Sequence, residues 1–186
     1  AAPIHYRVTP IDPNAHRFEV ELAIARPDPE GQRVAMPAWT PGSYMIREFA
    51  RNVVSIEAST ASGRRVALRK LDKATWRAAR CDEALHVRYQ VYAWDLSVRA
   101  AHLDSTHGFF NGSSLFLRAI GHEAQPCELQ LDPPAGDGYA DWRVATTMPS
   151  AGAREHGFGA YRACDYAELI DHPVEIGRFT LASYDV

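Results

Sequence analysis

Hydrophobic and polar residues alternate along much of this chain with a period of two, which is typical of a β-strand with one buried face. The stretches 18–24 and 86–94 show the pattern most clearly. The side chains on their apolar faces are Phe18, Val20, Leu22, Ile24, Val87, Tyr89 and Val91. Shorter runs of the same kind predict strands at residues 53–58, 66–70, 75–79, 114–120, 127–131, 142–146 and 178–184.

Turn-forming residues separate these runs, notably at 27–31, 61–63 and 132–138. One helical signal stands near the end of the chain, where Asp165 and Glu168 have the spacing of an N-terminal capping box and Pro173 stops the helix. We therefore expect an all-β fold, an antiparallel β-sandwich with a short helix near the C-terminus. At 186 residues, the sequence suits a single domain spanning 1–186.

Two stretches do not fit a plain sandwich. Residues 36–49 are rich in aromatic side chains and contain two prolines and a glycine, so we expect a structured but irregular loop that turns at Pro41 and Gly42. Residues 102–112 are polar and aromatic with two glycines, and we expect a second irregular loop there. Because loops carry function more often than strands do, these two stretches are the places to look for a site.

Composition narrows the classes of partner. The net charge of −3 argues against a nucleic-acid partner, which is bound by neutralising many phosphates. No apolar run approaches the roughly 18 residues of a membrane-spanning helix, so we expect no membrane segment. The three cysteines show no spacing of a zinc site or a redox pair. The sequence leaves a cytoplasmic and a periplasmic location both open.

The eight histidines invite a search for zinc ligands, and we expect no metal site in this chain. His122 and Glu123 begin like the His-Glu-x-x-His helix of zinc peptidases, but Pro126 stands where the second histidine is needed and would break the helix. His102 and His107 can meet in a loop, yet we expect hydrogen-bonded loop histidines there. No nucleophile elbow or phosphate-binding loop is present, so we expect no catalytic residue.

Three motifs occur in a recognisable order. Residues 37–52 read PAWTPGSYMIREFARN, residues 89–99 read YQVYAWDLSVR, and residues 107–116 read HGFFNGSSLF. The closing run 169–177 reads LIDHPVEIG. Together they make the chain resemble, over nearly its whole length, the N-terminal domain of the glycyl aminopeptidase family of zinc metallopeptidases.

The resemblance implies a β-sandwich-like domain that packs against a thermolysin-like catalytic domain further along the polypeptide, often followed by a PDZ domain. Both of these domains are absent from this chain. In the family, the catalytic domain holds zinc through a His-Glu-x-x-His helix and releases N-terminal glycine, less readily alanine, from peptides. We therefore expect zinc and peptide substrate in the parent enzyme only, with this chain alone inactive and without a cofactor.

The resemblance also suggests roles for residues of the two irregular stretches. The candidates for one edge of the substrate cleft are His107, Gly108, Phe109, Phe110, Asn111 and Gly112. The candidates for the interface with the catalytic domain are Trp39, Tyr44, Arg47, Arg51, Trp94 and Arg99. If that interface is uncovered in this chain, we expect weak self-association.

Two other readings stay open at this point. The aromatic stretches also suit a free-standing β-sandwich module that binds peptide or carbohydrate directly. A purely structural scaffold that never contacts substrate is the third possibility.

Overall fold

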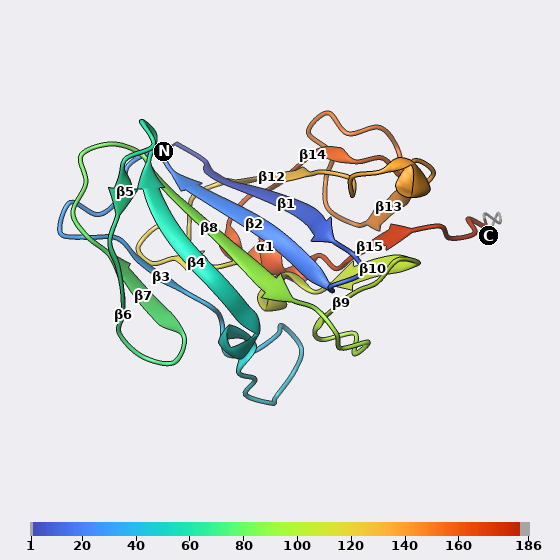
Figure 1. Cartoon of the computed structure of the whole chain (residues 1–186), viewed down its shortest axis with the longest axis horizontal. Helices are drawn as coiled ribbons and strands as arrows, with labels where there is room; N and C mark the ends of the chain where they lie inside the picture. Colours follow the sequence, from blue (N-terminus) through green and yellow to red (C-terminus); the bar gives the residue numbers. More distant parts are fainter. Residues whose placement is uncertain (1, 183–186) are drawn as a thin grey trace.

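The alternating stretches form the centre of a seven-stranded sheet in the computed structural model, which describes residues 2–182 (Figure 1). β2 (Arg17–Ile24) and β8 (Leu85–Tyr92) pair antiparallel, with Phe18 opposite Val91. Every second residue of each strand is buried, as the pattern predicts. One face of this sheet therefore supplies much of the core.

The large sheet runs from β14 at one edge to β5 at the other. In spatial order its strands are β14 (Gly159–Ala163), β12 (Cys127–Leu131), β1 (Ile4–Asp12), β2, β8, β4 (Val53–Thr60) and β5 (Arg65–Val66). All neighbouring strands are antiparallel except β1 and β12, which pair in parallel.

Two four-stranded sheets contribute to the same core as the large sheet. The first contains β13 (Arg143–Thr146), β15 (Val174–Gly177), β10 (His107–Phe110) and β9 (Ala101–Leu103). The second contains β11 (Arg118–Ala119), β3 (Arg33–Ala35), β7 (Thr75–Ala78) and β6 (Leu68–Lys70). Phe18 of the large sheet meets Phe110 of the first small sheet edge to face, with ring centroids 5.6 Å apart. The all-β, sandwich-like fold with one short helix is confirmed.

The helix forms where the capping box predicts it. α1 (Tyr166–Asp171) begins after Asp165, whose carboxylate accepts a hydrogen bond from the Glu168 N–H at 2.8 Å. In Figure 1, α1 lies behind β2 and β8. Within residues 2–182, no helix is long and apolar enough to cross a membrane.

The segment 115–117 crosses the core without joining a sheet, so the predicted strand at 114–120 is wrong. Ser114, the first residue of the predicted strand, lies in the 3-10 helix η2 (Gly112–Ser114). Only Arg118 and Ala119 of β11 pair with another strand. Leu115, Phe116 and Leu117 are all fully buried. Three consecutive buried residues do not alternate between two faces, so this part of the sequence argues against a half-buried strand.

Tyrosine hydroxyls satisfy the backbone of this crossing segment. The Tyr89 hydroxyl donates to the Leu115 carbonyl at 2.7 Å and accepts from the Leu117 N–H at 2.9 Å. In the same way, Tyr6 donates to the Leu117 carbonyl at 2.8 Å, and Tyr166 donates to the Phe116 carbonyl at 2.7 Å. Burial raises the pKa of Tyr89, so the hydroxyl stays protonated and can donate. Side chains from the large sheet and from α1 thus replace a strand partner.

Three further predictions need correction. The predicted strand at 66–70 is two strands, because the chain leaves the large sheet after β5 and joins the small sheet at β6. Residues 102–112 are mainly the β9–β10 hairpin rather than a loop, since Gly108 and Phe110 alternate inward. The predicted strand at 178–184 is not found within residues 178–182, since the last strand, β15, already ends at Gly177, whose φ is +146°. Residues 183 and 184 lie outside the described part of the chain. The strands β1, β3, β14 and β15 were not predicted from the pattern.

The remaining elements are two 3-10 helices. η1 (Phe49–Asn52) joins the loop 36–48 to β4, and η3 (Asp137–Tyr139) precedes β13. The loop 36–48 is irregular, as the sequence predicts. It lies with η1 at the lower end of the molecule in Figure 1.

Candidate functional site

The loop 36–48 is closed at its base and exposed at its tip. The Arg47 N–H donates to the Ala38 carbonyl at 2.6 Å, and the Ser43 N–H donates to the Thr40 carbonyl at 3.0 Å across the Pro-Gly turn. Gly42 in that turn has a φ of +76°, which favours glycine. The tip presents Tyr44, which is fully exposed, and Ile46, which is 85% exposed. A fixed backbone therefore displays large apolar side chains to the outside.

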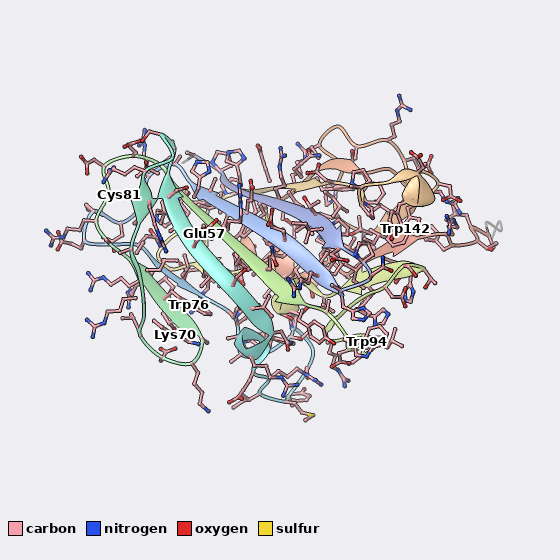
Figure 2. All side chains as sticks on the ribbon, viewed as in Figure 1. Glu57, Lys70, Trp76, Cys81, Trp94 and Trp142 are labelled. Atoms are coloured by element: carbon pink, nitrogen blue, oxygen red, sulfur yellow. The ribbon has the colours of Figure 1, made fainter. Side chains whose placement is uncertain are left out.

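A second loop, residues 93–100, displays a similar set. The Asp95 carboxylate accepts from the Ser97 N–H at 2.8 Å, and the Ala100 N–H donates to the Ser97 carbonyl at 3.0 Å. Leu96 and Val98 are 71% and 72% exposed. Figure 2 shows Trp94 at this lower rim of the molecule, away from Trp142.

The two loops are joined by a buried polar contact. Thr40 is buried, and its hydroxyl lies 2.8 Å from that of Ser113 in η2 and 3.4 Å from the Arg99 carbonyl. A groove of about 270 Å³ runs between the loops, lined on its two sides by residues such as Ile46 and Asp95. We name the exposed side chains of both loops the apolar loop face: Trp39, Tyr44, Met45, Ile46, Trp94, Leu96 and Val98.

Arginines border the apolar loop face. Arg47 is half-buried, whereas Arg51 and Arg99 are exposed. Within residues 2–182, none of the three forms an ion pair with a carboxylate, and the Nε of Arg47 is buried without a hydrogen-bond partner. Arg47 and Arg51 also line a groove of about 380 Å³ together with Lys70 and Lys73. This rim can therefore accept acidic groups from a partner.

The structure divides the six cleft-edge candidates into two sets. Gly108, Phe110 and Gly112 are buried. A Cβ at Gly108 would lie 2.9 Å from Ile176, and one at Gly112 would lie 2.8 Å from the backbone of Ile170. The alternate residues His107, Phe109 and Asn111 are partly exposed. Only this second set can contact a neighbouring molecule without a change in the hairpin.

Asn111 already uses its carbonyl oxygen within the chain. Its Oδ1 accepts from the Ser113 N–H at 3.3 Å and from the Ser113 hydroxyl at 2.9 Å, which caps η2. The Asn111 backbone N–H donates to the Ala100 carbonyl at 2.9 Å. Its first role is thus to connect the hairpin to the loop 93–100.

The sequence that resembles a zinc-binding helix forms no helix. His122 Nε2 lies 3.1 Å from the Gln32 Oε1, and the Gln125 amide donates to His122 Nδ1 at 2.6 Å. Both ring nitrogens of His122 are therefore occupied by amides. The Glu123 carboxylate accepts from the Gly121 N–H at 2.8 Å. These residues do not fit a catalytic zinc ion.

A constellation that the sequence only hinted at lies in the β9–β10 hairpin. Asp104 stands between His102 and His107, and the candidate ligand atoms of the three residues all lie within 4.8 Å of one another. Sequence reasoning considered the two histidines but missed Asp104, which lies two residues after His102 and three before His107. It also missed Met45, Ile46, Leu96 and Val98 as parts of the exposed face, since exposure of an apolar residue leaves no local signal.

The chain is similar to a known protein family and to solved structures. Residues 5–178 match the model of the Peptidase M61 N-terminal domain. The structure resembles an aminopeptidase N family protein from Idiomarina loihiensis, with a TM-score of 0.92 and 41% sequence identity. That match covers 98% of this chain, which spans 30% of the length of the Idiomarina protein.

A more distant likeness concerns the fold alone. A mutant M1 zinc metallopeptidase from Deinococcus radiodurans, bound to a Tyr-Ser-Ala substrate, shares 11% identity at a TM-score of 0.51, over 94% of this chain and 41% of that one. No curated protein matches the sequence. The family match spans nearly all of the chain, from β1 to the end of β15, and this chain therefore belongs to the Peptidase M61 N-terminal domain family.

Proposed function

We propose that this chain is the non-catalytic N-terminal domain of a zinc aminopeptidase that releases N-terminal glycine, or alanine, from peptides. In this proposal the apolar loop face packs on the catalytic domain, and the neighbouring hairpin shapes the cleft. The exposure of that face is the observation that carries the proposal. The family match and the chain's 30% share of the Idiomarina protein support it, because a related polypeptide has room for further domains.

The physical argument rests on solvation. Large apolar side chains gathered on one exposed face usually mark a surface that another protein covers. The backbone of both loops is fixed by hydrogen bonds, so covering them costs little conformational entropy. The bordering Arg47 and Arg51 have no carboxylate partner among residues 2–182 and can pair with acidic side chains of the catalytic domain.

In this proposal, the edge of the substrate cleft is formed by His107, Phe109 and Asn111. These are the alternate residues of the hairpin that face outward, and Asn111 connects the hairpin to the apolar loop face. Packing of that face on a catalytic domain would bring the hairpin to the same boundary. An imidazole, an aromatic ring and an amide there suit contact with a peptide end.

Zinc in this proposal belongs to the parent enzyme and would activate water for attack on the first peptide bond. The residues around His122 do not fit it. This chain's contribution is to position and enclose substrate. We therefore expect this chain alone to be inactive.

The first test compares this chain with the full-length parent. We expect hydrolysis of glycyl-p-nitroanilide by the parent only, and slower hydrogen exchange at residues 39–46 and 94–98 in the parent than in the isolated chain. Equal exchange in both forms would show that the apolar loop face is not covered, and the packing proposal would then fail.

A variant sharpens the test. Ile46→Asp places a charge on the apolar loop face, and we expect a lower kcat/KM in the parent together with faster exchange across both loops. Leu71→Asp is the matched control, since Leu71 is also exposed, at 45%, but lies in the β6–β7 turn. Binding of peptides or glycans by the isolated chain, with an uncovered face in the parent, would favour the free-standing module instead.

A further inference from the structure

The three residues of the β9–β10 turn present nitrogen and oxygen atoms to one small volume. His102 Nε2 lies 3.0 Å from Asp104 Oδ2, and His107 Nδ1 lies 3.6 Å from Asp104 Oδ1. Two ligands bound to one tetrahedral ion at about 2.1 Å are separated by about 3.4 Å, and the contacts of 3.0 and 3.6 Å lie on either side of that value. The spacing of His102 and Asp104 thus already suits a shared cation.

Asp104 is held in place by its own turn. Its Oδ1 accepts from the Thr106 N–H at 2.7 Å, the Thr106 hydroxyl at 2.6 Å and the His107 N–H at 3.0 Å. Burial alone would raise the pKa of Asp104, but these hydrogen bonds and the one to His102 outweigh it and hold that pKa below its ordinary value. The carboxylate is therefore ionised and leaves Oδ2 directed at His102.

His102 is fixed by stacking and lacks one polar partner. Its side chain is 3% exposed and lies between the rings of Trp94 and His107, with centroids 4.8 and 5.0 Å away. Its Nδ1 is buried and forms no hydrogen bond within the described part of the chain. This Nδ1 points away from Asp104, so the ring nitrogen available to a site shared with Asp104 is Nε2.

His107 supplies the adjustable third position. Its side chain is 34% exposed, so a rotation about its side-chain bonds can bring a ring nitrogen toward the other two ligands. Burial raises the pKa of Glu175 on β15 and the neighbouring His107 lowers it, so a further carboxyl group lies near this turn. Two imidazoles with one carboxylate favour zinc and the late first-row metals over calcium or magnesium, which prefer oxygen ligands.

We propose that His102, Asp104 and His107 bind one Zn²⁺ ion, or a similar late first-row ion, at the β9–β10 turn. The ion leaves a coordination position open to solvent on the exposed side of His107. It ties the hairpin beside Trp94 and so stiffens the border of the apolar loop face.

The test is calorimetric titration of the tag-free chain with ZnCl₂, together with cobalt absorption spectra. We expect one ion per chain and a raised Tm, because a ligand that binds only the folded state stabilises it. Loss of an outer-shell partner of a metal costs about 10–100-fold in affinity, so His107→Ala, which removes a ligand, is expected to weaken binding at least as much. Since His107 is partly exposed, this variant should fold.

A control variant distinguishes binding at this site from binding by surface histidines in general. His5→Ala removes an exposed histidine that lies 3.2 Å from the Glu128 carboxylate, and it should leave affinity unchanged. Equal losses in both variants would mean adventitious binding by surface histidines, and absence of one-to-one binding to the wild type would also overturn the proposal.

Discussion

Two irregular segments of this molecule have similar apolar composition but opposite surroundings. Residues 115–117 are fully buried, whereas the apolar loop face contains Tyr44 and Ile46, which are almost entirely exposed. Tyrosine hydroxyls from the large sheet and from α1 bind the backbone of the first segment. The loops of the second bind their own backbone and leave their side chains outward. An irregular apolar segment is thus buried in the core when other elements supply its polar partners, and is exposed when no element of the chain covers it.

The largest expected loss of stability comes from a substitution at Tyr89, which holds the buried segment 115–117. In Tyr89→Phe, the Leu117 N–H loses its partner and the Leu115 carbonyl loses a donor, both in the core. An unsatisfied buried group costs about 1–3 kcal/mol, so we expect a loss of about 2–4 kcal/mol in the free energy of unfolding, measured with urea. Tyr92→Phe, at an exposed position of the same strand, should change it by less than about 0.5 kcal/mol. Equal effects would show that the hydroxyl bonds do not hold the crossing segment.

Gly112 tests the close approach of η2 to α1. In Gly112→Ala, the new methyl group would lie 2.8 Å from the Ile170 Cα and 3.0 Å from the Leu169 carbonyl oxygen. Overpacking of this kind costs about 1–3 kcal/mol. Gly138→Ala is the control, because a Cβ there meets no atom within 4 Å. A thermal melt that leaves Gly112→Ala as stable as the wild type would contradict the packing of η2 on α1.

Asp104 lies in the β9–β10 turn beside the apolar loop face, and its effect depends on pH. Its pKa is lowered in the folded state, so its ionised form stabilises the fold above the ordinary aspartate pKa of about 3.9, and this contribution is lost as the pH falls. We expect Asp104→Asn to cost about 1 kcal/mol at neutral pH, since the amide oxygen still accepts some of the hydrogen bonds. Unfolding measured at several pH values should show the two proteins converging in acid. A difference that stays constant would exclude this role.

The smallest effect on stability is expected on the apolar loop face itself. Ile46→Ser removes an 85% exposed side chain and should change the free energy of unfolding by less than about 0.5 kcal/mol. The same variant should reduce weak self-association of the isolated chain, measured by light scattering at high concentration. A strictly monomeric wild type would count against an uncovered interface.

The sequence predicted elements best where local pattern and burial agree. The strands β2 and β8 and the capped helix α1 follow from alternation and from the Asp165–Glu168 spacing. The strand predicted at 66–70 was divided, since Ala67 marks the change from one sheet to another and leaves no trace in a period-two pattern. The hairpin at 101–110 was read as a loop because its short strands carry polar residues such as His102 and His107.

The candidate sites were also predicted only in part, because the sequence pattern is local. Motif order pointed to Trp39, Tyr44 and Trp94, which are exposed as a partner surface requires. It grouped six hairpin residues together, yet alternation in β10 buries Gly108 and Phe110 and turns His107 and Phe109 outward. The joining of the two loops through Thr40 and the Arg99 carbonyl, which lie far apart in the chain, could not be predicted from sequence patterns.

By itself, the sequence determined the all-β class, the short capped helix and the family, because alternation, capping and motif order are local properties of the chain. Only the tertiary structure decided which apolar residues are core and which are exposed, since burial depends on partners brought from distant elements. The placement of Tyr6, Tyr89 and Tyr166 around the crossing segment shows this most directly. Likewise, Asp104 became part of a candidate metal site only when the hairpin turn set it between two imidazoles.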